Sequence, residues 1–346
     1  MITISDYNEI FIAAGADRKI HVYLNNGDIF FNDDSLMDSS SDVVTADITG
    51  DGKWIMAVGK HGAVYIYKFS FKTHKFQQYQ QIAASSLIFG GDMTDDHLWM
   101  AFGENDGIVS VYTFDGSSFV LDQTIDQLPS VRSLALTNDH EMLAVATVYD
   151  VYIYQHNGTK FNLIQTLSPG SSYTKVSWTD DHQYLTFGEY YPYFAFVYNN
   201  TGGSYTMIEN NGEFSKKHES SLRDISFSSS KKLLAVSSES GLDLYANFEA
   251  GYATLEQTIE QSVKTHQISK DEAYLILGSD TLEVYMNDEY PNCNIYHCTK
   301  CLNSTYCEHC NELLDYFLDE VGTCQLCNIT GCIECEDVTT CNTCDD

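Results

Sequence analysis

The chain has 346 residues and a formal net charge of −31, from 18 basic and 49 acidic side chains. Such a charge repels nucleic acids and anionic membranes, which are bound through cationic side chains, so neither is expected as a partner. Apolar residues make up 43% of the sequence, enough for a folded core, and no apolar run is long enough to span a membrane. All 11 cysteines lie between Cys293 and Cys344, which divides the chain into residues 1–288 and residues 289–346.

Residues 1–288 repeat one pattern of short strands seven times. An apolar position recurs at steps of 41 to 49 residues, at Phe11, Ile55, Met100, Leu143, Leu185, Leu234 and Leu275. A tyrosine recurs independently at steps of 40 to 47, at Tyr23, Tyr67, Tyr112, Tyr154, Tyr198, Tyr245 and Tyr285. The strands are rich in β-branched and aromatic residues and are separated by Gly, Asn and Asp turns. Because this period is typical of a four-stranded propeller blade, we predict an all-β, seven-bladed β-propeller.

The ends of the repeat segment do not supply a shared outer strand. The alignment of the units places Met1 inside the first strand of the first unit, where Ile4 corresponds to Leu136. The stretch 286–291 reads as a poor strand. We therefore expect the chain to be a fragment or its true start to lie upstream, so the lack of a secretory signal at Met1 carries no weight.

The second unit shows how the repeat is built. An Asp-Gly turn within Thr49–Lys53 leads into an apolar strand from Trp54 to Gly59, and Val64-Tyr65-Ile66-Tyr67 follows. In these features residues 1–288 resemble the WD-repeat family. They depart from it because no Gly-His dipeptide precedes the first strand and Tyr replaces the terminal Trp-Asp. The hydrogen-bond set of a WD blade is therefore not carried over.

The cysteines form two copies of one spacing, 34 residues apart. They are Cys293, Cys298, Cys301, Cys307, Cys310, Cys324, Cys327, Cys332, Cys335, Cys341 and Cys344. The first copy lacks its opening cysteine, since Tyr290 stands there. A segment this short and polar needs cross-links in place of an apolar core. Disulfides are favoured over zinc because the gaps between Cys-x2-Cys pairs are short for one tetrahedral site and Lys300 is the one Lys or Arg of the segment.

The spacing resembles the furin-like, growth-factor-receptor type of cysteine-rich repeat. The resemblance implies an extracellular stalk or recognition module with a disulfide at each cysteine. Four N-glycosylation sequons agree with it, at Asn157, Asn199, Asn303 and Asn328, the first two expected in exposed loops. An odd cysteine count leaves one free thiol, or a thiol whose partner lies beyond Asp346.

No catalytic residue, metal site or cofactor is expected. The sequence lacks Gly-x-Ser-x-Gly, His-Glu-x-x-His and phosphate-loop motifs. His97, His140 and His182 occupy the same turn of consecutive units, so the repeat accounts for them.

Basic residues recur at one position of the repeat. Arg132, Arg223 and Lys264 start the first strands of their units, and Lys175 is one position off. Since the first strand of a blade is the innermost, we predict that they rim a mouth of the channel. They would bind an acidic peptide, a sulfated or carboxylated glycan, or a small acid. Alternatively, they are separately solvated or neutralise nearby Asp and Glu.

These observations predict a non-catalytic recognition or adhesion module outside the cell or in the ectodomain of a membrane protein. The propeller would stand on a disulfide-rich stalk and bind a protein or glycan ligand at its mouth. One alternative is an intracellular propeller scaffold with zinc bound in the C-terminal segment. Another is a propeller enzyme such as a glycoside hydrolase or lyase, which a closely spaced acidic pair in the channel would favour.

Overall fold

The structure is a computed structural model. It describes residues 1–25, 30–36, 42–170, 173–191, 193–208, 220–246, 254–287, 297–303, 305–314, 316–319, 322–327, 329, 332–335 and 340–344. Within these ranges the protein is all-β, and its one helical element is a single 3-10 turn, η2 (Glu312–Leu314). None of the described residues belongs to a helix long and apolar enough to cross a bilayer.

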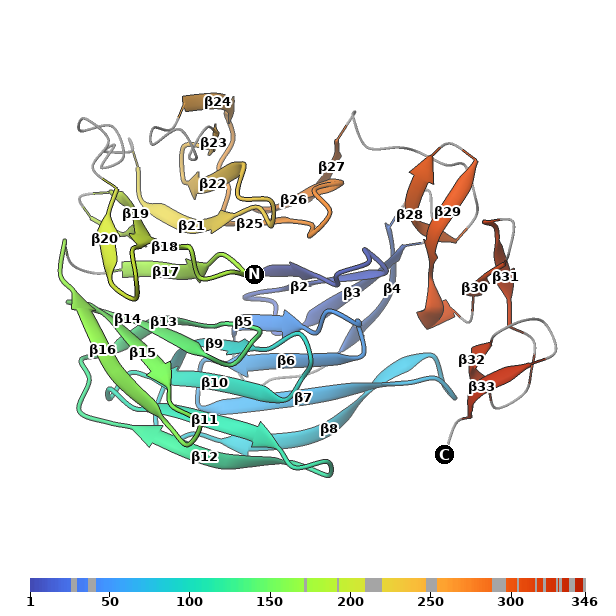
Figure 1. Cartoon of the computed structure of the whole chain (residues 1–346), viewed down its shortest axis with the longest axis horizontal. Helices are drawn as coiled ribbons and strands as arrows, with labels where there is room; N and C mark the ends of the chain where they lie inside the picture. The colour runs from blue at the N-terminus through green and yellow to red at the C-terminus, as the bar shows by residue number, and fades with distance from the viewer. Residues whose placement is uncertain are drawn as a thin grey trace.

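Seven antiparallel sheets form the blades of a β-propeller (Figure 1), as the repeat predicts. Blade 1 contains β1 (Ile2–Ile4), β2 (Ile10–Ala14), β3 (Ile20–Asn25) and β4 (Phe30–Leu36); blade 2 contains β5 (Val43–Ile48), β6 (Trp54–Gly59), β7 (Ala63–Ser70) and β8 (Lys75–Ala83). Blade 3 contains β9 (Ile88–Met93), β10 (Trp99–Glu104), β11 (Val109–Phe114) and β12 (Phe119–Ile125); blade 4 contains β13 (Val131–Leu136), β14 (Met142–Thr147), β15 (Val151–His156) and β16 (Phe161–Leu167). Blade 5 contains β17 (Tyr173–Trp178), β18 (Tyr184–Glu189), β19 (Ala195–Asn200) and β20 (Tyr205–Met207); blade 6 contains β21 (Leu222–Phe227), β22 (Leu233–Ser238), β23 (Leu242–Ala246) and β24 (Thr254–Ile259). Blade 7 contains β25 (Thr265–Ile268), β26 (Tyr274–Gly278) and β27 (Leu282–Met286).

The two recurring sequence positions are direct partners in every blade. The apolar position lies on the second strand and the tyrosine on the third. The pairs are Phe11 with Tyr23, Ile55 with Tyr67, Met100 with Tyr112, Leu143 with Tyr154, Leu185 with Tyr198, Leu234 with Tyr245 and Leu275 with Tyr285. The same register in seven sheets confirms that the repeat is a blade.

The core lies between blades as well as within them. Met56 and Ile66 of blade 2 pack with Met100 and Phe102 of blade 3 in one buried cluster. Each sheet therefore covers its neighbour's apolar face, which no single blade can bury alone.

The C-terminal stretch consists of three hairpins. They pair β28 (Cys298–Asn303) with β29 (Tyr306–Cys310), β30 (Tyr316–Leu318) with β31 (Cys324–Leu326), and β32 (Cys332–Cys335) with β33 (Cys341–Cys344). Four disulfides hold them, Cys298–Cys307, Cys310–Cys324, Cys327–Cys335 and Cys332–Cys341, and Cys301 is also disulfide-bonded. The disulfide-rich prediction is thus confirmed for these nine cysteines; Cys293 lies outside the described residues.

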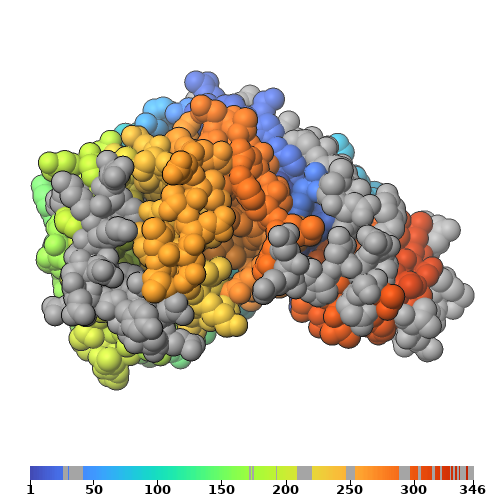
Figure 2. All heavy atoms as spheres, turned by 90° about the horizontal axis from the view of Figure 1, so that it is seen from above, coloured from blue at the N-terminus to red at the C-terminus, as the bar shows by residue number. Residues whose placement is uncertain are grey.

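The 34-residue repeat extends to the connectivity of the disulfides. Cys298–Cys307 in the first copy corresponds to Cys332–Cys341 in the second, and Cys310–Cys324 is the link between the hairpins of the two copies. The stretch forms a lobe at one side of the propeller (Figure 2). Its first copy is not held away from the propeller as a stalk would be, because Leu313 is fully buried in a core cluster with residues of blades 1 and 2.

Candidate functional site

The axis of the ring is a polar channel, and the N-terminus lies near its centre (Figure 1). The inner strands of all seven blades contribute to its walls. It contains two cavities of about 160 and 250 Å³, which share Met1, Lys175 and Asp224 in their linings. The smaller cavity opens at the starts of the inner strands and the larger one at their ends.

The four basic residues singled out in the sequence all line the smaller cavity. Arg132, Arg223 and Lys264 stand at its rim, and Lys175 lies in the next layer down. The inner strands of blades 4, 5 and 6 share one register shift, and within it Lys175 is equivalent to Ser133 and Asp224, one residue after the position of Arg132 and Arg223. The structure thus brings the predicted side chains to one mouth, here called the cationic mouth.

Three contacts position the rim cations. Arg223 pairs with Glu239, Lys264 Nζ lies 2.6 Å from Asp280 Oδ1, and the Arg132 guanidinium lies 4.8 Å from the centre of the Phe89 ring. The two ion pairs are at the surface; the side chains of Lys264 and Asp280 are 60% and 93% exposed. Exposed pairs of this kind contribute about 0–1 kcal/mol, so a ligand can compete for both cations.

Exposed tyrosines flank the cationic mouth. Tyr149 is 64% exposed, Tyr190 47% and Tyr191 66%. The Tyr190 ring lies 5.8 Å from the Arg223 guanidinium. The loop of Tyr149 is tied to the chain that enters β13, because the Val148 amide donates to the Ser130 carbonyl at 3.1 Å. Tyrosine and arginine side by side on an exposed rim are the composition of binding hot spots.

A pair of aspartates lies deeper in the channel, and the sequence analysis did not identify it. Asp47 of β5 and Asp92 of β9 are hydrogen-bonded to one another. Burial raises the pKa of both carboxyls above their usual value, that of Asp92 well above it because Asp47 is beside it. Two carboxyls this close cannot both ionise without mutual repulsion, so we expect the pair to hold one shared proton.

These carboxyls also join adjacent blades. Asp47 Oδ2 accepts from the Met93 amide of the next inner strand at 3.1 Å, and Asp92 Oδ2 accepts from the Leu136 amide at 2.6 Å. Asp224 does the same one layer away, accepting from the His266 amide at 3.3 Å. Aspartates in two layers of the channel thus bridge the inner strands, a structural role that accounts for their burial.

Charge is balanced around Lys175. Burial alone would raise the pKa of Asp224, but Lys175, His266 and the Thr265 hydroxyl hold it below its usual value. The Thr265 Oγ1 donates to Asp224 Oδ2 at 2.8 Å. Burial lowers the pKa of His266, whose Nε2 lies 3.0 Å from Ser226 Oγ. The buried Asp224 carboxylate thus balances the charge of Lys175, whereas the rim cations face solvent.

The opposite mouth carries the opposite charge. Lys270 Nζ lies 2.5 Å from Asp6 Oδ2 and 3.6 Å from Asp95 Oδ2. Burial and the neighbouring Asp6 raise the pKa of Asp95 to about 7. An anionic ligand therefore has one favourable entrance to the channel, the cationic mouth.

The shared proton predicts a pH-dependent stability. A carboxyl whose pKa is raised by folding stabilises the fold most below its unfolded pKa and loses that contribution as pH rises through its folded pKa. Asp92→Asn keeps an acceptor for the Leu136 amide and donates to Asp47. Its free energy of unfolding relative to that of the wild type should therefore be higher at pH 8 than at pH 4. Urea unfolding at both pH values measures this. Asp122→Asn, at an exposed aspartate, is the control, and equal pH dependence in all three proteins would contradict the shared proton.

The three histidines have structural roles. Their equivalents across the blades all have positive φ, namely Asn8, Gly52, His97, His140, His182, Lys231 and Glu272. The His97 and His140 rings stack on Trp54 and Trp99 of the preceding blades at 4.9 and 5.6 Å. His140 and His182 also place Nε2 2.9 Å from Asp96 and Asp139. Among the described residues no two of these histidines share a potential metal-ligand group.

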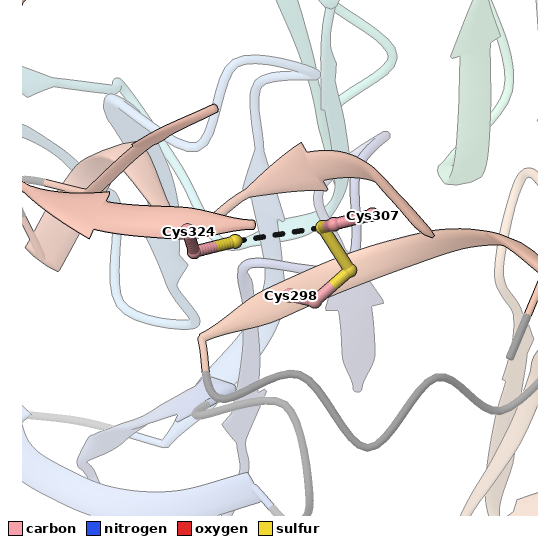
Figure 3. Close-up of side chains that lie close together, drawn as sticks. All are labelled: Cys298, Cys307 and Cys324. Atoms are coloured by element: carbon pink, nitrogen blue, oxygen red, sulfur yellow. Dashed lines mark hydrogen bonds between the residues drawn. A yellow bond between two sulfur atoms is a disulfide. The ribbon is translucent and has the colours of Figure 1, made fainter. Parts of the chain in front are cut away.

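Sulfur atoms gather in the first cysteine-rich copy. The Sγ atoms of Cys298, Cys307 and Cys324 lie within 4.8 Å of one another, and Cys324 Sγ is 3.5 Å from Cys307 Sγ (Figure 3). Reduced, such a cluster would offer thiolates to zinc. Here Cys298 is bonded to Cys307 and Cys324 to Cys310, and a disulfide sulfur is not a thiolate ligand.

Two of the four sequons lie at sites that can be described in full. Asn157 is exposed in the turn between β15 and β16, as expected. Asn199 does not lie in an exposed loop: it is half-buried within β19, and its Oδ1 accepts from Gln183 Nε2. Both β15 and β19 end two residues after the recurring tyrosine, so Asn199, one residue after Tyr198, is a strand residue, whereas Asn157, three residues after Tyr154, lies beyond its strand. The side chain of Asn303 and the whole of Asn328 lie outside the described residues.

The fold defines the class of protein: a seven-bladed β-propeller with a disulfide-rich C-terminal stretch. No family model matches the chain, and no curated protein matches it. A functionally unknown protein from Desulfotomaculum acetoxidans DSM 771 has a similar crystal structure, with a TM-score of 0.66 and 13% sequence identity over 80% of this chain and 92% of that one. The likeness extends to 1702 solved chains, so the fold alone does not narrow the function.

Proposed function

We propose that the chain is a non-catalytic recognition module of an extracellular or cell-surface protein. It has a WD-like propeller over residues 1–288 and furin-like repeats over residues 289–346, with N-glycans on Asn157, Asn303 and Asn328. The disulfides support the location, because such bonds persist in oxidising compartments. The cationic mouth carries the functional proposal, since it gathers four cations on a body of net charge −31.

The ligand is a protein that presents an acidic side chain at a loop tip. A cavity of about 160 Å³ holds one or two side chains, not a polymer. The rim tyrosines add the aromatic contact area that protein interfaces use. A polyanionic glycan is the less favoured ligand because the long-range field of the acidic body repels it.

A triple charge reversal tests the mouth. In Arg132→Glu/Arg223→Glu/Lys264→Glu, binding of a short peptide that carries a single aspartate should fall at least about 100-fold, as the loss of two charged hydrogen bonds implies. The control Lys72→Glu/Lys160→Glu/Lys232→Glu makes the same net-charge change at three exposed lysines outside this cavity. It should change affinity by less than about threefold, the effect of a rim charge alone.

Isothermal titration calorimetry with the peptide and with a heparin oligosaccharide gives the readout. Loss of peptide binding in the first variant alone supports the proposal. Equal losses of affinity in both variants would show that net charge, and not the cationic mouth, causes the effect. If heparin binds only when the cationic mouth is intact and the peptide does not bind at all, the ligand is a glycan and not a protein.

A hydrolase is the second candidate, because the channel holds a close acidic pair. The arrangement argues against a glycosidase. Its two carboxyls must stand about 5 Å or more apart to leave room for the sugar or for water, whereas Asp47 and Asp92 are hydrogen-bonded to one another. A glycosidase activity lost in Asp92→Asn but kept in Asp122→Asn would favour the enzyme.

A further inference from the structure

The ring has one seam at which neighbouring blades are not consecutive in the chain. Blade 7 meets blade 1 there, and no strand is shared between them among the described residues. Side chains make the junction: Ile2 packs with Ile276, and Asn8 Nδ2 donates to Asp271 Oδ2 at 2.7 Å. At each of the other six junctions the polypeptide itself continues from one blade into the next.

The chain that leaves blade 7 comes back to blade 1 as the first cysteine-rich copy. The Asn311 Nδ2 donates to the Asn25 carbonyl at 2.6 Å, and the Glu312 amide donates to Glu9 Oε1 at 2.8 Å. Asn25 ends β3, and Glu9 immediately precedes β2. Both partners therefore belong to blade 1, next to the Asn8 that contacts blade 7.

Apolar and aromatic contacts complete the docking. Leu313 is fully buried in the cluster that contains Ile10 of blade 1 and Ile55 of blade 2. The His309 ring stacks on Tyr7 with 3.9 Å between centroids. Because Leu313 is fully buried, removing its side chain should weaken the docking.

We propose that residues 309–313 act as a clasp that closes the ring at the seam, in place of a strand shared between the two ends of the propeller. The segment reaches blade 1 from a chain anchored in blade 7. The Cys298–Cys307 and Cys310–Cys324 disulfides hold its flanks. The clasp is therefore sensitive to reduction, whereas the propeller contains no cysteine.

Hydrogen exchange of the full chain with Leu313→Ala tests the clasp. Amide exchange in β1 and β26 should rise at least tenfold, and exchange in β14 and β15, in a blade away from the seam, should not change. Leu326→Ala is the matched control, because Leu326 lies in the same lobe but is 48% exposed. Unchanged exchange at the seam, or an equal rise in every blade, would overturn the proposal.

Glu9 provides a second test that leaves the core intact. Burial raises the pKa of Glu9 to about 8, with Glu312, Lys53 and Asp51 around it. Docking is then strongest with Glu9 protonated and weakens as pH rises through about 8. Burial lowers the pKa of His309 to about 4, so its charging opposes docking only below its usual pKa of 6.5.

Between pH 7 and pH 8, seam exchange corrected for intrinsic rate should therefore rise by up to tenfold in the wild type. Glu9→Gln keeps an acceptor for the Glu312 amide without a titrating proton, so its seam exchange should rise clearly less than that of the wild type, the remainder coming from Asp95 beside Lys270. A flat wild-type profile, or the same rise in Glu9→Gln, would contradict the clasp.

Discussion

Reduction of the disulfides is expected to unfold residues 297–344 while blades 2 to 6 stay folded. The buried cluster of this stretch consists of Cys298, Cys307 and Cys310, with other apolar side chains only partly buried around them. Each disulfide contributes roughly 2–4 kcal/mol, more than so small a core replaces. Limited proteolysis with and without reductant, in the presence of a chelator, locates the cleavage sites by mass.

The propeller serves as the internal control of that experiment, because residues 1–292 contain no cysteine. New cleavage confined to the C-terminal stretch is the expected result. A stretch that stays resistant in reductant and chelator would mean that something other than disulfides holds it. Resistance that disappears only when the chelator is added would favour the zinc alternative.

Trp54→Ala is expected to destabilise the propeller by about 3–5 kcal/mol, the cost of removing a large buried aromatic side chain. Trp54 is 4% exposed and lies between blades 2 and 3. Its ring is 4.9 Å from the His97 ring and 5.4 Å from that of Phe114. Denaturant unfolding gives the free energy directly.

His97→Asn measures the contribution of the stacked ring separately from that of the turn in which His97 stands. Asparagine tolerates the positive φ of His97, so the substitution removes the stacked ring and little else. It should cost clearly less than Trp54→Ala, about 1 kcal/mol as for one aromatic pair. A cost below 1 kcal/mol for Trp54→Ala, or a larger cost for His97→Asn, would contradict this description of the blade interface.

Local repetition made the fold predictable from the sequence. A blade is specified by alternation along its own strands, so seven copies show both the period and the register, as the pairing of Phe11 with Tyr23 and its equivalents shows. The same reasoning placed Arg132, Arg223 and Lys264 at one mouth. Position along an inner strand fixes position along the channel, whichever blade supplies the residue.

Features that depend on two different blades or segments were not predicted. Asp47 and Asp92 do stand at one repeat position, two residues before Thr49 and Thr94, and this recurrence was a signal available in the sequence. Their shared proton depends on how closely adjacent inner strands approach. Leu313 gave no signal, because its burial depends on the path of the chain after blade 7.

The sequence predicted that the cysteine-rich stretch is disulfide-bonded, but not that it docks against the propeller. Short gaps between the Cys-x2-Cys pairs, the single basic residue Lys300 and the sequons favoured disulfides, and the 34-residue repeat now extends to the bonds themselves. Docking against blade 1 depends on the complementarity of Asn311 and Leu313 with a surface some 300 residues earlier in the chain. A periodic pattern contains no information about such a contact.

The most direct test of an oxidised recognition module is the intact mass of natively produced protein, alkylated without reduction, together with a zinc assay. The structure accounts for nine bonded cysteines, and the repeat predicts Cys293 as the partner of Cys301, because the equivalent Cys327 is bonded to Cys335. We therefore expect ten of the eleven cysteines to be blocked, one to be a reactive thiol or paired beyond Asp346, and no zinc. Eleven reactive thiols after chelation, with zinc released, would contradict the extracellular account and favour an intracellular scaffold.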